Sequence, residues 1–238
     1  MTPSILVDFV NANGNIMVAL SSTVATPTSL VALLAELDIQ LPFERTGTVV
    51  DHFNYDTISA AEKHDVLVID AQSNVRPGMK DYLEMPGTIL AVPHAVGHIL
   101  GSGPLLTPVL RASQTAYSYD PKEQGEVVDP DDLFAAGQQL ALVSTMQARN
   151  AARVTVVGSA EMLQDSWFQA HVTKVGGKKV RPNNRGYARR LSGWTFQETG
   201  VLRVNDIEHR LQGSNETNPE LYRIKNDVVS PNSSVPSY

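Results

Sequence analysis

Residues 15–20 read Asn15-Ile16-Met17-Val18-Ala19-Leu20, directly after the turn-forming pair Asn13-Gly14. Apolar residues run through this segment without alternating with polar ones, a pattern typical of a strand that is buried on both faces, as in a parallel sheet. Thr26 and Pro27 then suit the N-cap and the first position of a helix. The leucines of that helix follow the spacing i, i+3, i+4 and i+7: Leu30, Leu33, Leu34 and Leu37. The stretch therefore predicts a strand followed by an amphipathic helix.

The same alternation continues along the chain. Short apolar or β-branched runs predict strands at residues 48–51, 66–69, 88–92, 115–119, 139–145, 153–157 and 201–204. A helix is predicted after Gly158-Ser159, with Met162, Leu163 and Trp167 on one face. Another is predicted over residues 184–199, where Tyr187, Leu191 and Trp194 share a face and Gly200 is a C-terminal stop. Strands that alternate with helices predict a layered α/β domain with a largely parallel sheet.

The composition changes to Asn, Ser, Thr and Pro from Gln212 onward. We therefore expect an α/β domain over residues 1–206. Residues 207–238 are expected to be a linker and the start of a second domain.

Charge and cysteine content exclude several classes of function. The 238 residues include 19 Lys and Arg against 25 Asp and Glu, which argues against nonspecific binding to nucleic acid or to an anionic membrane. Cysteine is absent, so the sequence holds no disulfide, thiolate zinc site, iron–sulfur cluster or cysteine nucleophile. No run of about 20 predominantly apolar residues is present, and Asp8 interrupts the first apolar run. We expect neither a membrane span nor a signal peptide in this sequence.

Three histidines follow predicted strands. His52 stands beside Asp51 at the carboxyl end of one strand, where the sites of open α/β sheets gather. The pair could serve as an acid–base pair or part of a metal site, or its side chains could hydrogen-bond the turn. His94 and His98 follow a later strand four residues apart, but Ala95 stands where a helical zinc motif needs Glu. A ligand-binding or hydrolytic site around His52, His94 and His98 is one hypothesis.

Other short motifs do not complete a site. Gly101-Ser102-Gly103 lacks the Gly-Lys-Ser/Thr ending of a phosphate loop and the spacing of a nucleophile elbow. Arg149 and Arg153 could hold a carboxylate or phosphate, or could tie their strands to neighbouring acidic loops. The motifs predict no catalytic residue, no cofactor and no metal ligand.

Three blocks of sequence together carry a family resemblance. They are Asp51-His52 with Asn54-Tyr55-Asp56, then Gln147-Ala148-Arg149-Asn150-Ala151-Ala152-Arg153-Val154, and then the segment 190–204 around Trp194. From about Ile5 to Val228 the chain resembles the non-catalytic lumenal subunit of eukaryotic oligosaccharyltransferase. That family is called the wheat-germ-agglutinin-binding subunit in fungi and the forty-eight-kilodalton subunit in animals. Phe53 stands where many animal members have a second His, which favours a fungal source.

The resemblance implies an endoplasmic-reticulum protein, on the lumenal side, in the complex that transfers a lipid-linked glycan to asparagine. Its partners would be the other oligosaccharyltransferase subunits, and another subunit would do the chemistry. The resemblance also implies a flavodoxin-like, class I glutamine-amidotransferase-like domain without its catalytic cysteine, and the absence of Cys agrees. Structural or interface roles are expected for the matching residues: Asp51, His52, Asn54, Tyr55, Asp56, Gln147, Arg149, Asn150, Arg153 and Trp194.

Family members begin with a signal peptide and the first strands of the α/β domain. They continue into β-rich lumenal domains and one membrane span. By this resemblance we expect an N-terminally truncated α/β domain that stops as the first β-rich domain begins. Membrane association would come only through the absent C-terminal span or through partner subunits. Asn215 and Asn232 begin N-glycosylation patterns, which matter in the secretory lumen.

Overall fold

The computed structural model describes residues 2–43, 47–71, 79–120, 133–202, 208–212, 215–218, 220 and 229–232. The chain forms two units, Met1–Gly200 and Val201–Tyr238. In the second unit, β13 (Glu208–Leu211) pairs antiparallel with β14 (Val229–Asn232). The boundary expected at residue 206 lies outside the described residues.

The main sheet of the first unit has four strands in the order β1-β10-β9-β7. They are β1 (Ile16–Ala19), β10 (Arg153–Val157), β9 (Ala141–Gln147) and β7 (Leu106–Arg111). The prediction of a largely parallel sheet is wrong, because β1 and β10 are the one parallel pair among the described strands. β9 and β10 are joined by the short turn 148–152, and a connection this short permits only antiparallel pairing.

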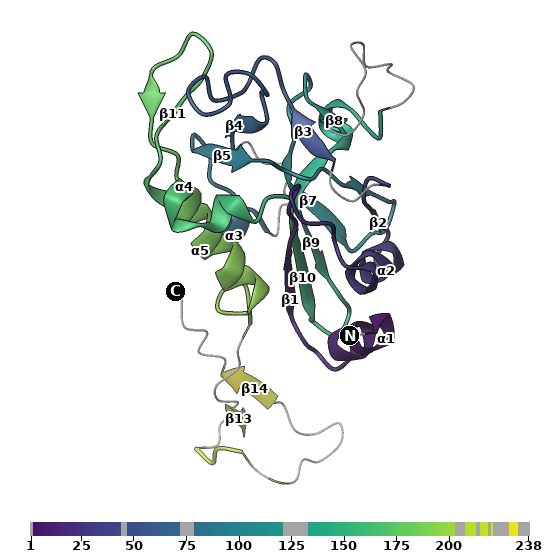
Figure 1. Ribbon diagram of the computed structural model, residues 1–238. Coiled ribbons are helices and arrows are strands. Elements are labelled where there is room, and N and C mark those ends of the chain that lie inside the picture. The colour runs from purple at the N-terminus through teal and green to yellow at the C-terminus, as the bar shows by residue number, and fades with distance from the viewer. Residues whose placement is uncertain are drawn as a thin grey trace. The chain divides into compact units, whose positions relative to one another are not determined.

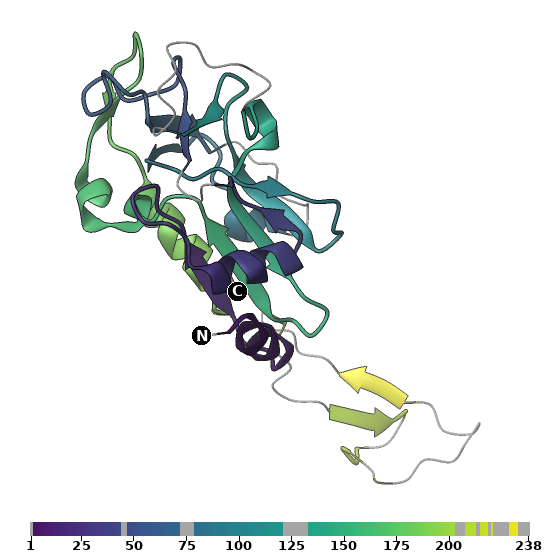
Figure 2. The same ribbon diagram turned by 45° about the vertical axis from the view of Figure 1, so that its right-hand side comes forward.

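Helices cover both faces of this sheet, as Figures 1 and 2 show. α1 (Pro3–Asn11) and α2 (Thr28–Glu36) lie on one face, and α5 (Asn184–Thr195) lies on the other. Along β10, Val154 and Val156 join the core that contains Val10 of α1 and Leu34 of α2. Thr155 points the other way and hydrogen-bonds Thr195 of α5 at 2.6 Å. β10 is therefore buried along its whole length, whereas β1, at the sheet edge, is fully buried only at Val18.

Four two-residue to five-residue strand pairs complete the first unit, and all are antiparallel. They are β3 (Thr48–Val50) with β8 (Tyr117–Tyr119), β4 (Val66–Asp70) with β5 (Ile89–Pro93), β2 (Ile39–Gln40) with β6 (Ile99–Leu100), and β11 (Val172–Thr173) with β12 (Lys179–Val180). Both views place β3, β4, β5 and β8 together beyond one end of the main sheet. The remaining helical segments are short: α3 (Lys80–Leu83), α4 (Asp165–Gln169), and the 3-10 turns η3 (Gly137–Gln139) and η4 (Glu161–Leu163).

Several predicted boundaries need correction. α2 begins at Thr28 with Pro27 in the cap position, one residue later than expected. The helix predicted after Ser159 is divided into η4 and α4, because Gln164 is extended. Residues 201–202 form no strand, and 203–204 lie outside the described residues. α1 and β7 were not predicted.

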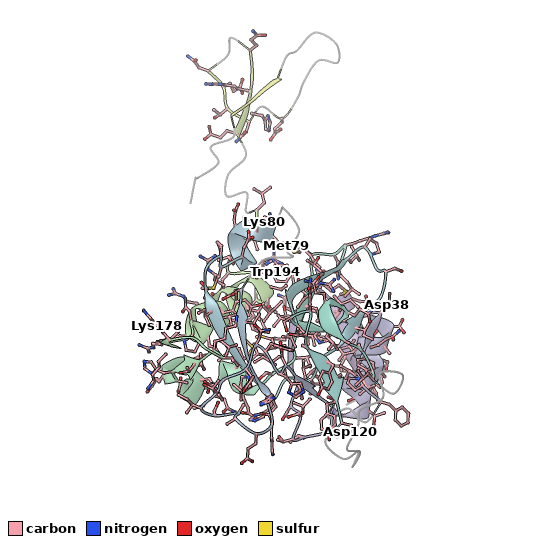
Figure 3. The ribbon with its side chains drawn as sticks, turned by 90° about the horizontal axis from the view of Figure 1, so that it is seen from above. Asp38, Met79, Lys80, Asp120, Lys178 and Trp194 are labelled. Carbon is pink, nitrogen blue, oxygen red and sulfur yellow. The ribbon has the colours of Figure 1, made fainter. Side chains whose placement is uncertain are left out.

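α5 carries the predicted apolar face. Tyr187, Leu191 and Trp194 are buried, as expected, although the helix ends at Thr195 rather than near residue 199. Figure 3 labels Trp194 on α5, and it labels Lys178 at the outer edge of the unit. Among the described residues, no helix has both the length and the apolar character required to cross a membrane.

Candidate functional site

A pocket of about 720 Å³ lies where several strands end. Its lining residues include Ser22 and Thr23 after β1, His52 after β3, His94 after β5 and Glu161 after β10. The full lining is Ser22, Thr23, Thr48, Val50, His52, Glu62, Lys63, Asp65, His94, Tyr117, Tyr119 and Glu161. Carboxyl ends of strands thus gather at one place, the position that the sequence predicted for His52.

Asp51 holds the loop that leads from β3 toward the pocket. Its buried carboxylate accepts hydrogen bonds from the amides of Phe53 (2.9 Å) and Asn54 (3.2 Å) and from the Asn54 side chain (3.0 Å). The hydroxyls of Ser113 and Thr115 donate to it as well. Burial alone raises the pKa of Asp51, but these donors outweigh burial and hold it below its usual value. Of the two hypotheses for the Asp51-His52 pair, Asp51 therefore follows the turn-stabilising one.

Asp56 stabilises the far end of the same loop through hydrogen bonds. Its carboxylate accepts from the amide and hydroxyl of Ser59 and from the Thr173 amide at 2.6 Å. Burial raises the pKa of Asp56, and these hydrogen bonds lower it further than burial raises it. Both carboxylates are consequently anchors for the loop.

His52 makes contacts that point into the pocket. Its Nδ1 atom contacts Nδ1 of His64, and its Nε2 atom lies 2.8 Å from the Tyr117 hydroxyl. Tyr55 stacks on the other side of His64 with ring centroids 3.9 Å apart.

His94 lies between two carboxylates. Its Nδ1 atom is 2.9 Å from Oε2 of Glu161, and its Nε2 atom is 3.7 Å from Oδ2 of Asp65. The backbone at His94 is left-handed, with φ +44°. Residues 94–98 form a turn and an isolated β-bridge rather than a helix, so His94 and His98 do not share a helical face.

His98 lies outside the pocket. It is fully buried in the main core, where its Nε2 atom is 2.7 Å from the Ser144 hydroxyl of β9. Burial lowers its pKa to about 4. The hypothesis of a site shared by His52, His94 and His98 is therefore wrong for His98, although the other two do line one pocket.

The second family block forms the β9–β10 hairpin. Asn150 donates to the carbonyls of Val10 (2.8 Å) and Asn11 (3.1 Å) at the end of α1, and its side-chain oxygen accepts from Ala152. Gln147 is half-buried, and Arg149 is exposed at the turn.

Arg153 and Trp194 meet from two different blocks. Buried Arg153 donates to the carbonyls of Trp194, Thr199 and Gly200 and lies 4.5 Å from the Trp194 ring centroid. The guanidinium of Arg153 therefore does not tie its strand to an acidic loop, because its N–H groups donate to backbone carbonyls in the last turn of α5 and just after it.

The comparisons with known proteins match this chain to one family. The model of the OST48 N-terminal domain matches residues 1–198. The chain belongs to the OST48 family. The resemblance described from the three blocks is thereby confirmed.

Curated relatives of the OST48 family cover nearly the whole chain. The fission yeast (Schizosaccharomyces pombe) dolichyl-diphosphooligosaccharide–protein glycosyltransferase subunit wbp1 is 32% identical over 96% of this chain and 49% of its own length. The 48 kDa subunits of the same enzyme from Caenorhabditis elegans and Danio rerio are 32% and 34% identical, over 96% and 91% of this chain and 50% and 47% of their own lengths. The chain thus spans about half the length of these OST48 relatives.

A solved structure supports the fold alone. The solved structure titled "mmIFT52 N-terminal domain" has a TM-score of 0.53 at 14% identity, over 84% of this chain and 72% of that chain. The OST48 chain is accordingly a mixed α/β domain with several small sheets.

Sequence reasoning missed several side chains that contact the predicted residues. His64, Ser113, Thr115 and Glu161 contact predicted residues from positions 12 to 67 residues away. No motif links them, because the contacts arise from strand pairs that close only in the folded OST48 domain. Among the described residues, no three His, Asp or Glu side chains converge so as to hold a metal ion.

Proposed function

We propose that this chain is part of an accessory, non-catalytic subunit of oligosaccharyltransferase, acting in protein N-glycosylation on the lumenal side of the endoplasmic reticulum. Membership of the OST48 family and the names of its relatives support this role. Its partners would be the other subunits of the complex, and catalysis would belong to one of them. Membrane association would come through those partners or through the remainder of the parent protein.

The observation that carries the proposal is what the family-matching side chains do. The side chains of Asp51, Asn150 and Arg153 form hydrogen bonds with backbone groups, and Asp51 also accepts from neighbouring hydroxyls. Such contacts position loops and helix ends and leave no activated nucleophile beside a base. Side chains that stabilise the fold in this way support a role in subunit assembly rather than in catalysis.

Arg149 is the family-matching residue that best fits a subunit contact. It is exposed at the tip of the β9–β10 turn, and it makes no side-chain hydrogen bond or ion pair with a described residue. Since Arg is enriched in protein interfaces, an exposed Arg at a rigid turn suits a partner's acidic or carbonyl groups.

The test uses the parent protein in cells, with a tagged partner subunit and the 238-residue domain carrying one substitution at a time. Arg149→Met should lower co-purification of the complex without lowering the domain's thermal stability. Asp51→Asn should lower assembly and glycan transfer in proportion, because both follow from a weakened domain. Normal assembly with lost glycan transfer in an Asp51 or His52 variant would overturn the proposal.

Finer assignments belong to the same proposal. A flavodoxin-like, amidotransferase-like origin is supported by the parallel β1–β10 pair, by helices on both faces and by a pocket at the strand ends. The division into residues 1–206 and 207–238 remains a prediction. A fungal source rests on Phe53 alone, since identities to the yeast and zebrafish relatives are alike.

Glycosylation of Asn215 and Asn232 follows only if the chain is lumenal. Asn215 is exposed, as an acceptor must be. Asn232 lies opposite Glu208 in the β13–β14 pair. Digestion of the parent protein, purified from cells, with an amidase that removes N-glycans, followed by mass spectrometry, would reveal occupancy at each site.

A further inference from the structure

The pocket at the strand ends carries an excess of negative charge. Glu62, Asp65 and Glu161 line it, and Lys63 is the one Lys or Arg among the described lining residues. His94 lies between Asp65 and Glu161, so a proton on His94 would offset one carboxylate more. With both lining histidines, His52 and His94, neutral, the three carboxylates against Lys63 leave the described lining of the pocket negative. An anionic ligand is therefore disfavoured, and a cationic group is favoured.

Glu62 has an unused carboxylate. It makes no hydrogen bond or ion pair with any described residue, whereas Glu161 shares its charge with His94. The same stretch, residues 58–63, lines a smaller adjoining hollow that also includes Asp65 and His94. The acidic wall is thus continuous over both hollows, with Glu62 available to an incoming group.

Two aromatic rings form another part of the pocket wall. Tyr117 and Tyr119 both belong to β8, and one residue separates them, so their side chains leave the strand on the same face. His52 holds the Tyr117 hydroxyl at 2.8 Å, which fixes that ring. Tyrosine rings attract a cation placed over their faces, and a planar guanidinium stacks on them particularly well.

Three exposed apolar residues lie in, or next in sequence to, the segments that line the two hollows. Val24 follows lining residue Thr23, Phe53 follows lining residue His52, and Ile58 lines the adjoining hollow. These three side chains are 66%, 67% and 64% exposed. Exposed large apolar side chains in the segments that line a charged pocket are typical of a surface that another protein covers.

We propose that this pocket receives an arginine side chain of a partner polypeptide, with apolar residues beside that arginine packing on Val24, Phe53 and Ile58. The guanidinium would donate to Glu62 and Glu161 and stack on Tyr117 or Tyr119. Arginine fits better than lysine because its planar fork binds carboxylates in pairs and stacks on rings at the same time. A volume of about 720 Å³ is within the range of protein ligand sites, which run from about 300 to 1,000 Å³.

The pocket chemistry is tested with a defined probe and the 238-residue chain. An acetylated and amidated peptide of sequence Ile-Arg-Phe is titrated into the protein by calorimetry, beside the same peptide with citrulline in place of arginine. Citrulline keeps the shape and loses the charge, so we expect its affinity to be at least about tenfold lower. Equal affinity for the two peptides would overturn the proposal.

Substitutions of the acidic residues that line the pocket test the same proposal. Glu62→Gln should weaken the arginine peptide several-fold, and Glu62→Gln with Glu161→Gln should abolish the preference for arginine over citrulline. Glu62→Gln disturbs no contact with a described residue, so it separates lost binding from lost folding. The matched control is Glu36→Gln at an exposed end of α2, which should change nothing. An arginine preference that survives the double substitution would also overturn the proposal.

The origin of the partner rests on the proposed role in subunit assembly, and co-purification separates the two ideas. If the parent protein assembles with the transferase subunits and Glu62→Gln weakens that assembly, the partner is a subunit of the complex. If it never assembles with them while the arginine preference holds, the proposed function fails and the pocket inference stands. If assembly is unchanged in the double variant and the peptides bind alike, the pocket inference fails and the proposed function stands.

Discussion

The guanidinium of Arg153, on β10 of the sheet, lies 4.5 Å from the ring centroid of Trp194, on α5, and donates to the backbone carbonyl of that same Trp194. Two further carbonyls, of Thr199 and Gly200, accept from the same guanidinium. The end of a helix leaves carbonyls without partners and carries a partial negative charge, and a buried arginine satisfies both. This one side chain therefore joins the C-terminal end of α5 to the sheet.

Arg153→Met should lower the free energy of unfolding by about 2–4 kcal/mol, because buried carbonyls lose a charged donor while the apolar stem is kept. Arg153→Lys should recover only part of the loss, since lysine lacks the fork and the stacking plane. Urea unfolding followed by tryptophan fluorescence measures both. Arg149→Met, at an exposed site four residues earlier, is the matched control and should stay within about 0.5 kcal/mol of the unsubstituted chain. Equal effects of the Arg149 and Arg153 substitutions would contradict this role for Arg153.

Asp51→Asn should lower the free energy of unfolding by about 2–4 kcal/mol. The carboxylate has two acceptor oxygens for its donors, whereas an amide has one and places its own NH₂ group against hydroxyl and amide donors. The pKa of Asp51 is lower in the folded chain than in the unfolded one. Its stabilising contribution is consequently complete above about pH 4, the unfolded value, and is lost as the pH falls below it. Unfolding midpoints in urea at pH 7 and pH 3 should therefore differ less for Asp51→Asn than for the unsubstituted chain. Asp8→Asn, on the exposed side of α1, should keep the full pH dependence.

His98 should make the domain less stable in mild acid. Its pKa is about 4 in the folded chain, against about 6.5 when unfolded. Between these two values the unfolded chain binds a proton that the folded chain refuses, so stability falls as the pH is lowered from about 6.5 toward 4. His98→Gln should flatten this part of the stability curve, measured as urea midpoints at pH 7, 6 and 5. Exposed His171→Gln should leave the curve unchanged, and a slope in His98→Gln as steep as in the unsubstituted chain would refute the assignment.

Ala151→Gly should stabilise the domain. Ala151 has φ +68° in the β9–β10 turn, a conformation that costs an L-residue about 1–2 kcal/mol and costs glycine nothing. Part of that gain is cancelled by the greater freedom of glycine in the unfolded chain, so we expect a net increase of about 0.5–1 kcal/mol in thermal or urea unfolding. Ala12→Gly, at φ −85° after α1, should instead be neutral or destabilising. A loss of stability in Ala151→Gly would mean that the turn adopts another conformation in solution.

The polarity pattern of the chain predicted its elements well where they are buried. The runs at 66–69 and 153–157 are strands, and those at 88–92 and 139–145 overlap β5 and β9, because apolar and β-branched residues are stable in a pleated strand that is covered on both sides. The spacing of Tyr187, Leu191 and Trp194 likewise predicted the buried face of α5. The three family blocks were sufficient to identify the family.

Strand direction and the composition of the pocket could not be read in this way. Apolar runs look the same in parallel and antiparallel sheets, so the direction of β9 and β7 depended on how their connections fold. Asn184 illustrates the same limit: its buried amide bonds Ala91 and Met162, residues from two other elements. From the sequence, a polar residue at a predicted helix start is interpreted as a helix cap. Only the fold shows that a strand lies beside it and receives its hydrogen bonds.

The amino-acid sequence by itself determined the buried segments, the absence of cysteine chemistry and the family, because these depend on residue type and local spacing. Tertiary structure alone decided that Asp51 and Arg153 form hydrogen bonds with backbone groups of neighbouring segments. It also decided that His98 is buried and that His52 and His94 line one acidic pocket. Those outcomes depend on contacts between residues more than forty positions apart, for example Asp51 with Ser113 and Arg153 with Trp194. Such contacts form only when the loops close, and no local preference encodes them.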